Sequence, residues 1–176
     1  MCGIIGGYDL DKISLGLDAI NHRGRDARAV KNISCVSFGH VRLQVMDTSS
    51  ASDQPMTVGD TTITFNGAVW NFRNIRDYLT QTYNISFKTD GDTEVLAHLI
   101  DREDLSGLSK IQGMFVVAWT RGNGDITIAR DRHGEVPCHY SLLDTAVFPH
   151  FMFCSEIKGL RALGVKNSLI EMLPSG

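Results

Sequence analysis

The chain has 176 residues, a formal net charge of −3 and a hydrophobic content of 43%. These values predict one globular domain with a substantial core, and they argue against a basic surface that would attract nucleic acid or anionic membranes. The chain does not open on a basic segment followed by a long apolar run, and it has no stretch of about 18 apolar residues, so we expect a cytoplasmic protein without a membrane partner. Its four cysteines form no Cys-x-x-Cys pair, which favours reduced thiols over disulfides or a zinc site.

Hydrophobic periodicity and turn residues predict the secondary structure of the first half of the chain. In chain order, the segments are a strand over residues 3–10, a helix over 13–21, two strands within 33–47 on either side of Gly39, a loop over 49–56 and a hairpin over 57–69. The second strand of that hairpin ends near Asn66 and Gly67.

The second half continues with longer helical patterns and then returns to strands. In chain order, the segments are helices over 71–84 and 92–103, a short helix over 104–113, a hairpin over 114–131, a strand pair over 139–143 and 151–155, and a helix over 155–164. In this last helix, Ser155 is the expected N-cap, Ile157 belongs to the apolar face and Gly164 ends the helix. The succession of strands, helices and strands with many hairpins predicts an α+β domain of packed antiparallel sheets covered by segregated helices.

Cys2 follows the initiator methionine directly. A thiol attacks a carbonyl carbon as the thiolate, and its ordinary pKa of about 8.5 calls for a base or an electropositive setting. If Met1 is removed, the α-amine of Cys2, with an ordinary pKa of about 7.7–8.0, can take the thiol proton. From position alone, a buried residue of the first strand is an equally good interpretation.

The chain resembles the N-terminal glutaminase domain of class II glutamine amidotransferases, a family of N-terminal nucleophile hydrolases, and most closely its asparagine synthetase branch. The resemblance rests on motifs in family order: MCGIIGG, HRGRDA, GHVRLQVMD, QPM, FNGAVWN, GDTEV, IQGMFVVAW, ARDRHGEVP and FCSEIKGL. It implies a four-layer α/β/β/α sandwich. It also implies hydrolysis of the glutamine side-chain amide through a thioester on Cys2, with no cofactor.

The resemblance also implies roles for four further residues. Asn66 and Gly67 match the residues that form the oxyanion hole. Arg42 matches the arginine that binds the substrate α-carboxylate, and Asp92 matches the acidic residue that receives the α-ammonium. Taken alone, Asn66-Gly67 is typical of a turn, Arg42 of an exposed strand residue and Asp92 of a helix N-cap.

The sequence departs from the family pattern at several positions. Ala68 stands where this branch usually has glutamate, which predicts weaker glutamine binding, by roughly 1.5–3 kcal/mol for a lost charged contact, unless Asp92 or another acid compensates. Arg25 replaces a proline, and His133 and Glu135 replace phenylalanine and lysine in a region expected to affect a partner-facing or loop surface. We expect no metal site in RHGEVPCH, because strand alternation sends Cys138 and His139 to opposite faces.

Residues 1–176 are expected to form a single glutaminase domain without a synthetase domain, since no pyrophosphate-binding glycine-rich loop is present. Ammonia would then pass to a separate or missing synthetase-type domain. Two alternatives remain open: an amidohydrolase of the same fold acting on another small amide, and a catalytically weak regulatory or scaffold homologue.

Overall fold

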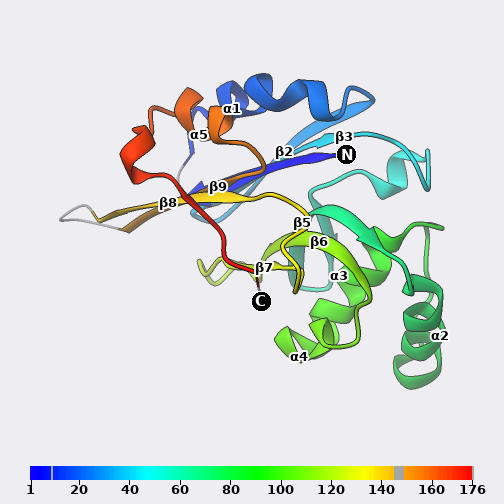
Figure 1. Ribbon diagram of the computed structural model, residues 1–176. Coiled ribbons are helices and arrows are strands. Elements are labelled where there is room, and N and C mark those ends of the chain that lie inside the picture. The colour runs from blue at the N-terminus through cyan, green and yellow to red at the C-terminus, as the bar shows by residue number, and fades with distance from the viewer. Residues whose placement is uncertain (9, 145–148, 176) are drawn as a thin grey trace.

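Two antiparallel sheets stack face to face in the computed structural model, which describes residues 1–8, 10–144 and 149–175 (Figure 1). The first sheet has the strand order β10-β8-β9-β1-β3-β2 and the second β4-β5-β6-β7. The strands are β1 (Gly3–Tyr8), β2 (Ala27–Ile33), β3 (Val36–Arg42), β4 (Met56–Val58), β5 (Thr61–Val69), β6 (Gly113–Thr120), β7 (Thr127–Arg130), β8 (His139–Asp144), β9 (Pro149–Cys154) and β10 (Glu171–Met172).

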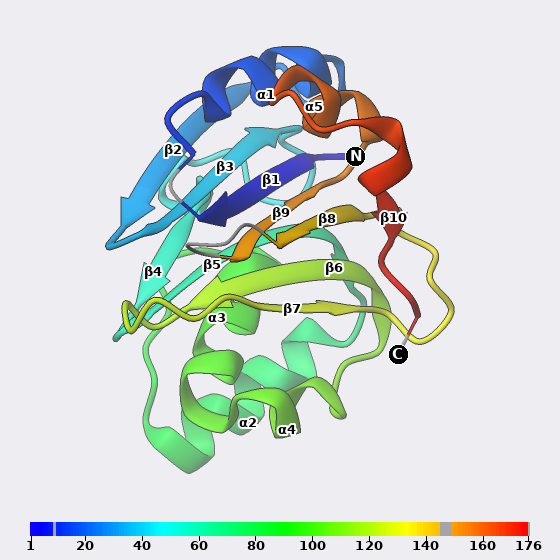
Figure 2. The same cartoon turned by 90° about the vertical axis from the view of Figure 1, so that its left-hand side faces the viewer.

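Helices cover the outer face of each sheet and complete four layers (Figure 2). Helices α1 (Ile13–Ile20) and α5 (Ile157–Ala162) lie on the first sheet. The second sheet carries α2 (Phe72–Tyr83), α3 (Asp92–Glu103) and α4 (Leu105–Leu108). The expected α/β/β/α sandwich is confirmed.

Each of the three interfaces between layers has its own apolar core, because successive strand residues point to opposite faces. On β1, Ile5 packs with α1 and α5, whereas Ile4 packs between the sheets with Phe38 and Phe153. The third core lies between the second sheet and its helices, and includes Phe65 and Leu99.

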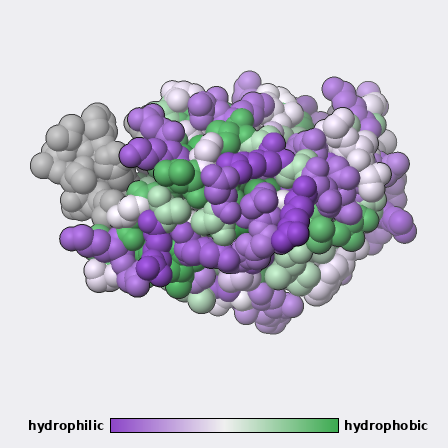
Figure 3. Space-filling view, turned by 90° about the horizontal axis from the view of Figure 1, so that it is seen from above, coloured by the Kyte–Doolittle hydropathy of each residue, from purple (hydrophilic) through white to green (hydrophobic). Residues whose placement is uncertain are grey.

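The outer surface of the first helical layer is mostly polar. Viewed from the α1–α5 side, hydrophilic side chains predominate and apolar ones lie in scattered patches (Figure 3). This is the distribution that an amphipathic helix produces when it buries its apolar stripe against a sheet. Among the described residues, no helix combines the length and apolar character needed to cross a bilayer.

Most of the predicted elements are confirmed, but the strand pair around Gly39 is wrong. The hairpin turns at Ser34, which has a φ of +54°, and β2 begins earlier than expected, at Ala27. Gly39 lies inside β3, and a larger residue would not fit there. A Cβ at this position would approach Ile5 Cγ2 to 2.9 Å and Leu17 Cδ1 to 3.0 Å. This glycine therefore permits close packing against the neighbouring strand and helix.

The predicted start of the last helix is also wrong. Ser155 does not cap α5, since its Oγ accepts a hydrogen bond from the backbone N–H of Ile4 at 2.9 Å and Glu156 takes the capping position. Ile157 is 43% exposed and lies off the buried face, whereas Gly164 follows the helix with a φ of +91°, as expected for a terminator. In the opening strand prediction, Asp9 lies outside the described residues.

Candidate active site

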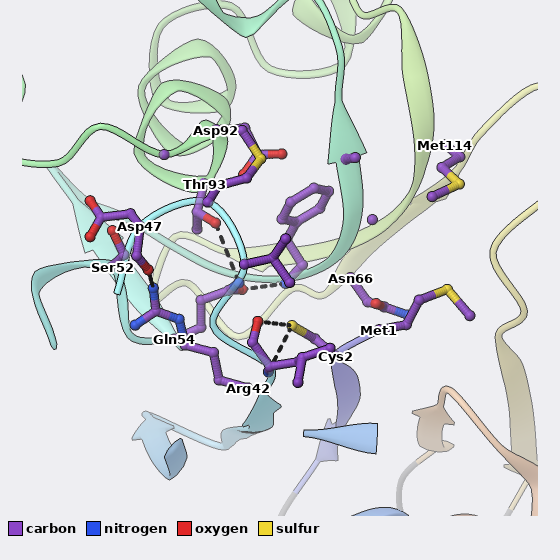
Figure 4. A pocket seen from close by; sticks show the side chains of 17 residues that line it. Met1, Cys2, Arg42, Asp47, Ser52, Gln54, Asn66, Asp92, Thr93 and Met114 are labelled. Atoms are coloured by element: carbon purple, nitrogen blue, oxygen red, sulfur yellow. Dashed lines mark hydrogen bonds between the residues drawn. The ribbon is translucent and has the colours of Figure 1, made fainter. Parts of the chain in front are cut away.

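Five residues singled out from the sequence line one cavity of about 240 Å³: Cys2, Arg42, Asn66, Gly67 and Asp92. Cys2 directly precedes β1, Arg42 ends β3, Asn66 and Gly67 lie in β5, and Asp92 opens α3. Because β1 pairs with β3 antiparallel, with Gly3 opposite Val41, the start of one strand and the end of the other lie together. Figure 4 shows Arg42 beside Asp47 on one side of the cavity and Asn66 with Met1 on the other.

The thiol of Cys2 is half-buried and contacts the backbone of Leu43. Its Sγ lies 3.4 Å from the Leu43 nitrogen, which donates to it, and 3.7 Å from the Leu43 carbonyl oxygen (Figure 4). Burial raises the pKa of this thiol, and the Leu43 N–H, the N-terminal ammonium and Arg42 only partly offset that effect. Thiolate formation here therefore requires a base, which is the need that a free α-amine on Cys2 would meet.

Arg23 and Glu156 hold the backbone of Cys2, and the sequence reasoning gave neither of them a role. The Cys2 carbonyl oxygen accepts a hydrogen bond from Arg23 Nε at 2.8 Å, and Arg23 Nη1 donates to Glu156 Oε1 at 2.9 Å. Burial alone would raise the pKa of Glu156, but hydrogen bonds from Arg23, Lys158 and His22 lower it to about 2. A signal was available in the HRGRDA motif, which contains Arg23.

Asn66 presents an unused donor in the buried part of the cavity wall. Its side chain is 1% exposed, and among the described residues its Nδ2 has no hydrogen-bond partner. Such a buried orphan group is rare, because it forgoes its hydrogen bonds to water without replacement. The neighbouring Gly67 has a φ of +153°, and a Cβ there would come within 2.1 Å of the Met114 carbonyl oxygen.

Arg42 is buried and makes three hydrogen bonds, which rules out the exposed-strand interpretation. Its Nη1 donates to Asp53 Oδ1 at 2.6 Å and to the Ser49 carbonyl at 2.8 Å, while Nη2 donates to the Asp47 carbonyl. Both carbonyls and the Asp53 carboxylate belong to the segment that follows β3, so this segment wraps around the guanidinium. No sequence motif indicates the ion pair between Arg42 and Asp53.

Asp92 lies at the N-terminus of α3 without serving as its N-cap. Gly91 occupies the capping position, and Asp92 Oδ2 accepts a hydrogen bond from the Val69 N–H at 2.9 Å. Burial raises the pKa of Asp92, and the backbone N–H groups of Val69, Asp92 and Thr93 oppose that shift. The contact with Val69 joins α3 to β5, the strand that also carries Asn66 and Gly67.

The remaining cavity wall is largely apolar. Ala68 lines it close to the residues above, so no carboxylate is present at that position. Val45 and Met46 also line the cavity and are 76% and 49% exposed. His133 and Glu135 border a different cavity, of about 800 Å³, together with Trp70 and the C-terminal segment from Leu173 to Ser175.

Residues 1–172 match the glutamine amidotransferase domain family. The chain belongs to this family. Among curated relatives, it is 31% identical over 160 residues to Amidase chyE of Penicillium rubens, covering 89% of this chain and 23% of that protein. It is 33% identical over 175 residues to the glutamine-hydrolysing asparagine synthetase 3 of Bacillus subtilis, covering 92% and 28%.

Solved structures support the same fold. The glutamine phosphoribosylpyrophosphate amidotransferase of B. subtilis superposes with a TM-score of 0.77 at 19% identity, over 98% of this chain and 49% of that one. The glutamine amidotransferase domain described here spans about a quarter of the length of the two curated relatives above.

Proposed function

We propose that this domain hydrolyses the side-chain amide of glutamine to glutamate and ammonia, with Cys2 as the nucleophile. The Nδ2 of Asn66, which has no partner within the described part of the chain, is the observation that carries the proposal. A catalytic donor must point to where an oxyanion will form, and it has no acceptor until the oxyanion is present. Asn66 and Cys2 line the same cavity, and Gly67, which follows Asn66, lines it too.

The proposed reaction begins after removal of Met1. The α-amine of Cys2 takes the thiol proton, and the thiolate attacks the amide carbon to form a tetrahedral intermediate. Its oxyanion accepts hydrogen bonds from Asn66 Nδ2 and the Gly67 N–H. As the C–N bond breaks, the α-ammonium returns the proton to the departing ammonia, which leaves a glutamyl thioester. Water, deprotonated by the same amine, then attacks the thioester and releases glutamate and the thiol.

In this proposal, Arg42 binds the α-carboxylate and Asp92 the α-ammonium of glutamine. Arg23 fixes the backbone of Cys2 through its carbonyl oxygen, with Glu156 holding Arg23. Ammonia passes to a synthetase-type domain or protein, as the names of the asparagine synthetase relatives suggest. A reducing, cytoplasmic setting suits a thiol nucleophile, and all four cysteines are free.

A second candidate is hydrolysis of another small amide by the same nucleophile. Ala68 favours this candidate, because without a carboxylate at this position Asp92 is the expected acidic partner of a substrate ammonium, so that group is held less strongly. In addition, two relatives carry the name amidase.

Ammonia release from glutamine and from a panel of primary amides distinguishes the two candidates. The glutaminase proposal predicts that glutamine has the highest kcat/KM, and that Cys2→Ala abolishes turnover while Cys35→Ala does not. Highest turnover of a different amide would favour the second candidate. Equal ammonia release by the parent and Cys2→Ala would exclude Cys2 as nucleophile, and no release from any amide by the parent would favour the scaffold alternative.

A further inference from the structure

The guanidinium of Arg42 has more anchors than its orientation requires. Two of them are backbone carbonyls, those of Ser49 and Asp47, and the third is the carboxylate of Asp53. Two hydrogen bonds from different nitrogens already fix a planar guanidinium in space. The distinct contribution of Asp53 is therefore its negative charge.

Asp53 approaches Arg42 from outside the main cavity. It borders a separate small cleft with His40 and Gln54, and Arg42 lines both that cleft and the main cavity. A substrate carboxylate in the cavity would therefore meet a guanidinium whose charge Asp53 already offsets. The Arg42 side chain is 7% exposed and that of Asp53 36%, so water screens the Arg42 end of this pair less than the Asp53 end.

The opposite end of the substrate is also weakly held. Ala68 provides no charge, and burial favours the neutral form of Asp92. The reacting amide, in contrast, faces Cys2, Asn66 and Gly67. Asp47 also lines the cavity, but its carboxylate oxygens accept from the backbone N–H groups of Ser49 and Asp90, which leaves Asp92 as the acid expected to meet the ammonium.

We propose that Asp53 is a specificity-determining residue, which offsets the charge of Arg42 and so lowers the preference of the site for amides that carry a free α-carboxylate. The inference rests on the proposed function and extends its substrate class to γ-carboxamides without that carboxylate. The predicted consequence is a modest difference in affinity between L-glutamine and 4-aminobutanamide, which is glutamine without its α-carboxylate.

The test measures the dissociation constants of both ligands by calorimetry in a Cys2→Ala background, which prevents turnover. Asp53→Asn removes the charge and keeps an oxygen acceptor for Arg42 Nη1. Because charge-assisted hydrogen bonds exceed neutral ones by about 1 kcal/mol, the ratio Kd(4-aminobutanamide)/Kd(glutamine) should rise about fivefold. The control is Asp26→Asn. The Asp26 carboxylate accepts from the Gln44 N–H just after β3, and its contact with Arg42 is through the backbone, where the Asp26 N–H donates to the Arg42 carbonyl at 3.0 Å, which the substitution keeps.

A ratio that stays constant or falls in Asp53→Asn would overturn the proposal and leave Asp53 as an anchor for Arg42. Failure of Asp53→Asn to bind glutamine would also overturn it. The side chain of Asp53 is 36% exposed, so the substitution should fold, and Asp53→Ser gives a second variant for which the same increase is expected. The binding measurements do not need the nucleophile, so they test the role of Asp53 independently of the proposed reaction. The glutaminase reaction is refuted separately if the chain with Cys2 intact releases no ammonia.

Discussion

Replacing Asn66 with alanine should separate catalysis from stability. The Asn66 side chain is 1% exposed and its Nδ2 has no partner among the described residues, so in the folded protein this donor is desolvated without compensation. An unsatisfied buried group costs about 1–3 kcal/mol, whereas the alanine variant loses only the packing of one short side chain. The two effects oppose each other, and we expect the free energy of unfolding to change by less than about 1 kcal/mol.

Catalysis should respond very differently to the same substitution. Loss of one oxyanion donor lowers kcat by about 10²–10³, equivalent to about 3–4 kcal/mol of transition-state stabilisation. Urea unfolding and steady-state ammonia release, measured on the same preparation, give the two quantities independently.

Thr64→Val is the matched control. Thr64 lies two residues earlier on β5 and is fully buried, and its side-chain oxygen also lacks a partner among the residues that the structure describes. It lies outside the set of residues that line the cavity. We expect this variant to be at least as stable as the parent and to have an unchanged kcat. If Asn66→Ala retains the parental kcat, or loses activity only in proportion to the unfolded fraction, the assignment of Asn66 to the oxyanion hole is refuted.

Three further predictions follow from named contacts. Ala68→Glu adds a carboxylate to the cavity wall and should lower KM for glutamine about tenfold in steady-state assays. The uncharged variant Ala68→Gln should not lower KM. Equal KM values for the glutamate and glutamine variants would contradict the role given to this position. Gly67→Ala should lower the free energy of unfolding, measured by urea denaturation, by more than about 2 kcal/mol, because the new Cβ would lie 2.1 Å from a backbone oxygen. In the control Gly91→Ala, the new Cβ meets no atom closer than 3.5 Å, so this variant should have little effect on stability. Glu156 has a folded-state pKa of about 2, below its usual value, so its contribution to stability is present above pH 4.5 and is lost as the pH falls toward 2. Thermal unfolding of Glu156→Gln should therefore depend less on pH in this range than that of the parent. Identical pH profiles for the two proteins would contradict the network around Arg23.

The order and type of most elements could be predicted because local patterns determine them. Helix α3 has a continuous buried stripe that includes Val95 and Leu99, and the hairpin of β6 and β7 has glycines at its turn. The turn at Ser34 could not be predicted in this way. Gly39 is the more obvious turn residue from the sequence. Its role inside a strand, which is to allow close packing against α1 and β1, becomes visible only in the folded structure.

Long-range hydrogen bonds account for the other errors. Ser155 is a good N-cap by type, but its Oγ binds Ile4, which lies 151 positions away in the sequence. The same limit applies to the site. The motifs identified Cys2, Asn66 and Gly67, which the structure places around one cavity, whereas the pairing of Arg42 with Asp53 depends on how the segment after β3 folds back.

The most direct test of the account is the mass of the protein before and after reaction with an electrophilic glutamine analogue such as 6-diazo-5-oxo-L-norleucine. We predict a chain that starts at Cys2, gains one label on its N-terminal peptide and is protected from labelling by excess glutamine. An ammonia-releasing protein that retains Met1, or a label on Cys35, Cys138 or Cys154 in place of Cys2, would contradict the proposal that the N-terminal cysteine is the nucleophile.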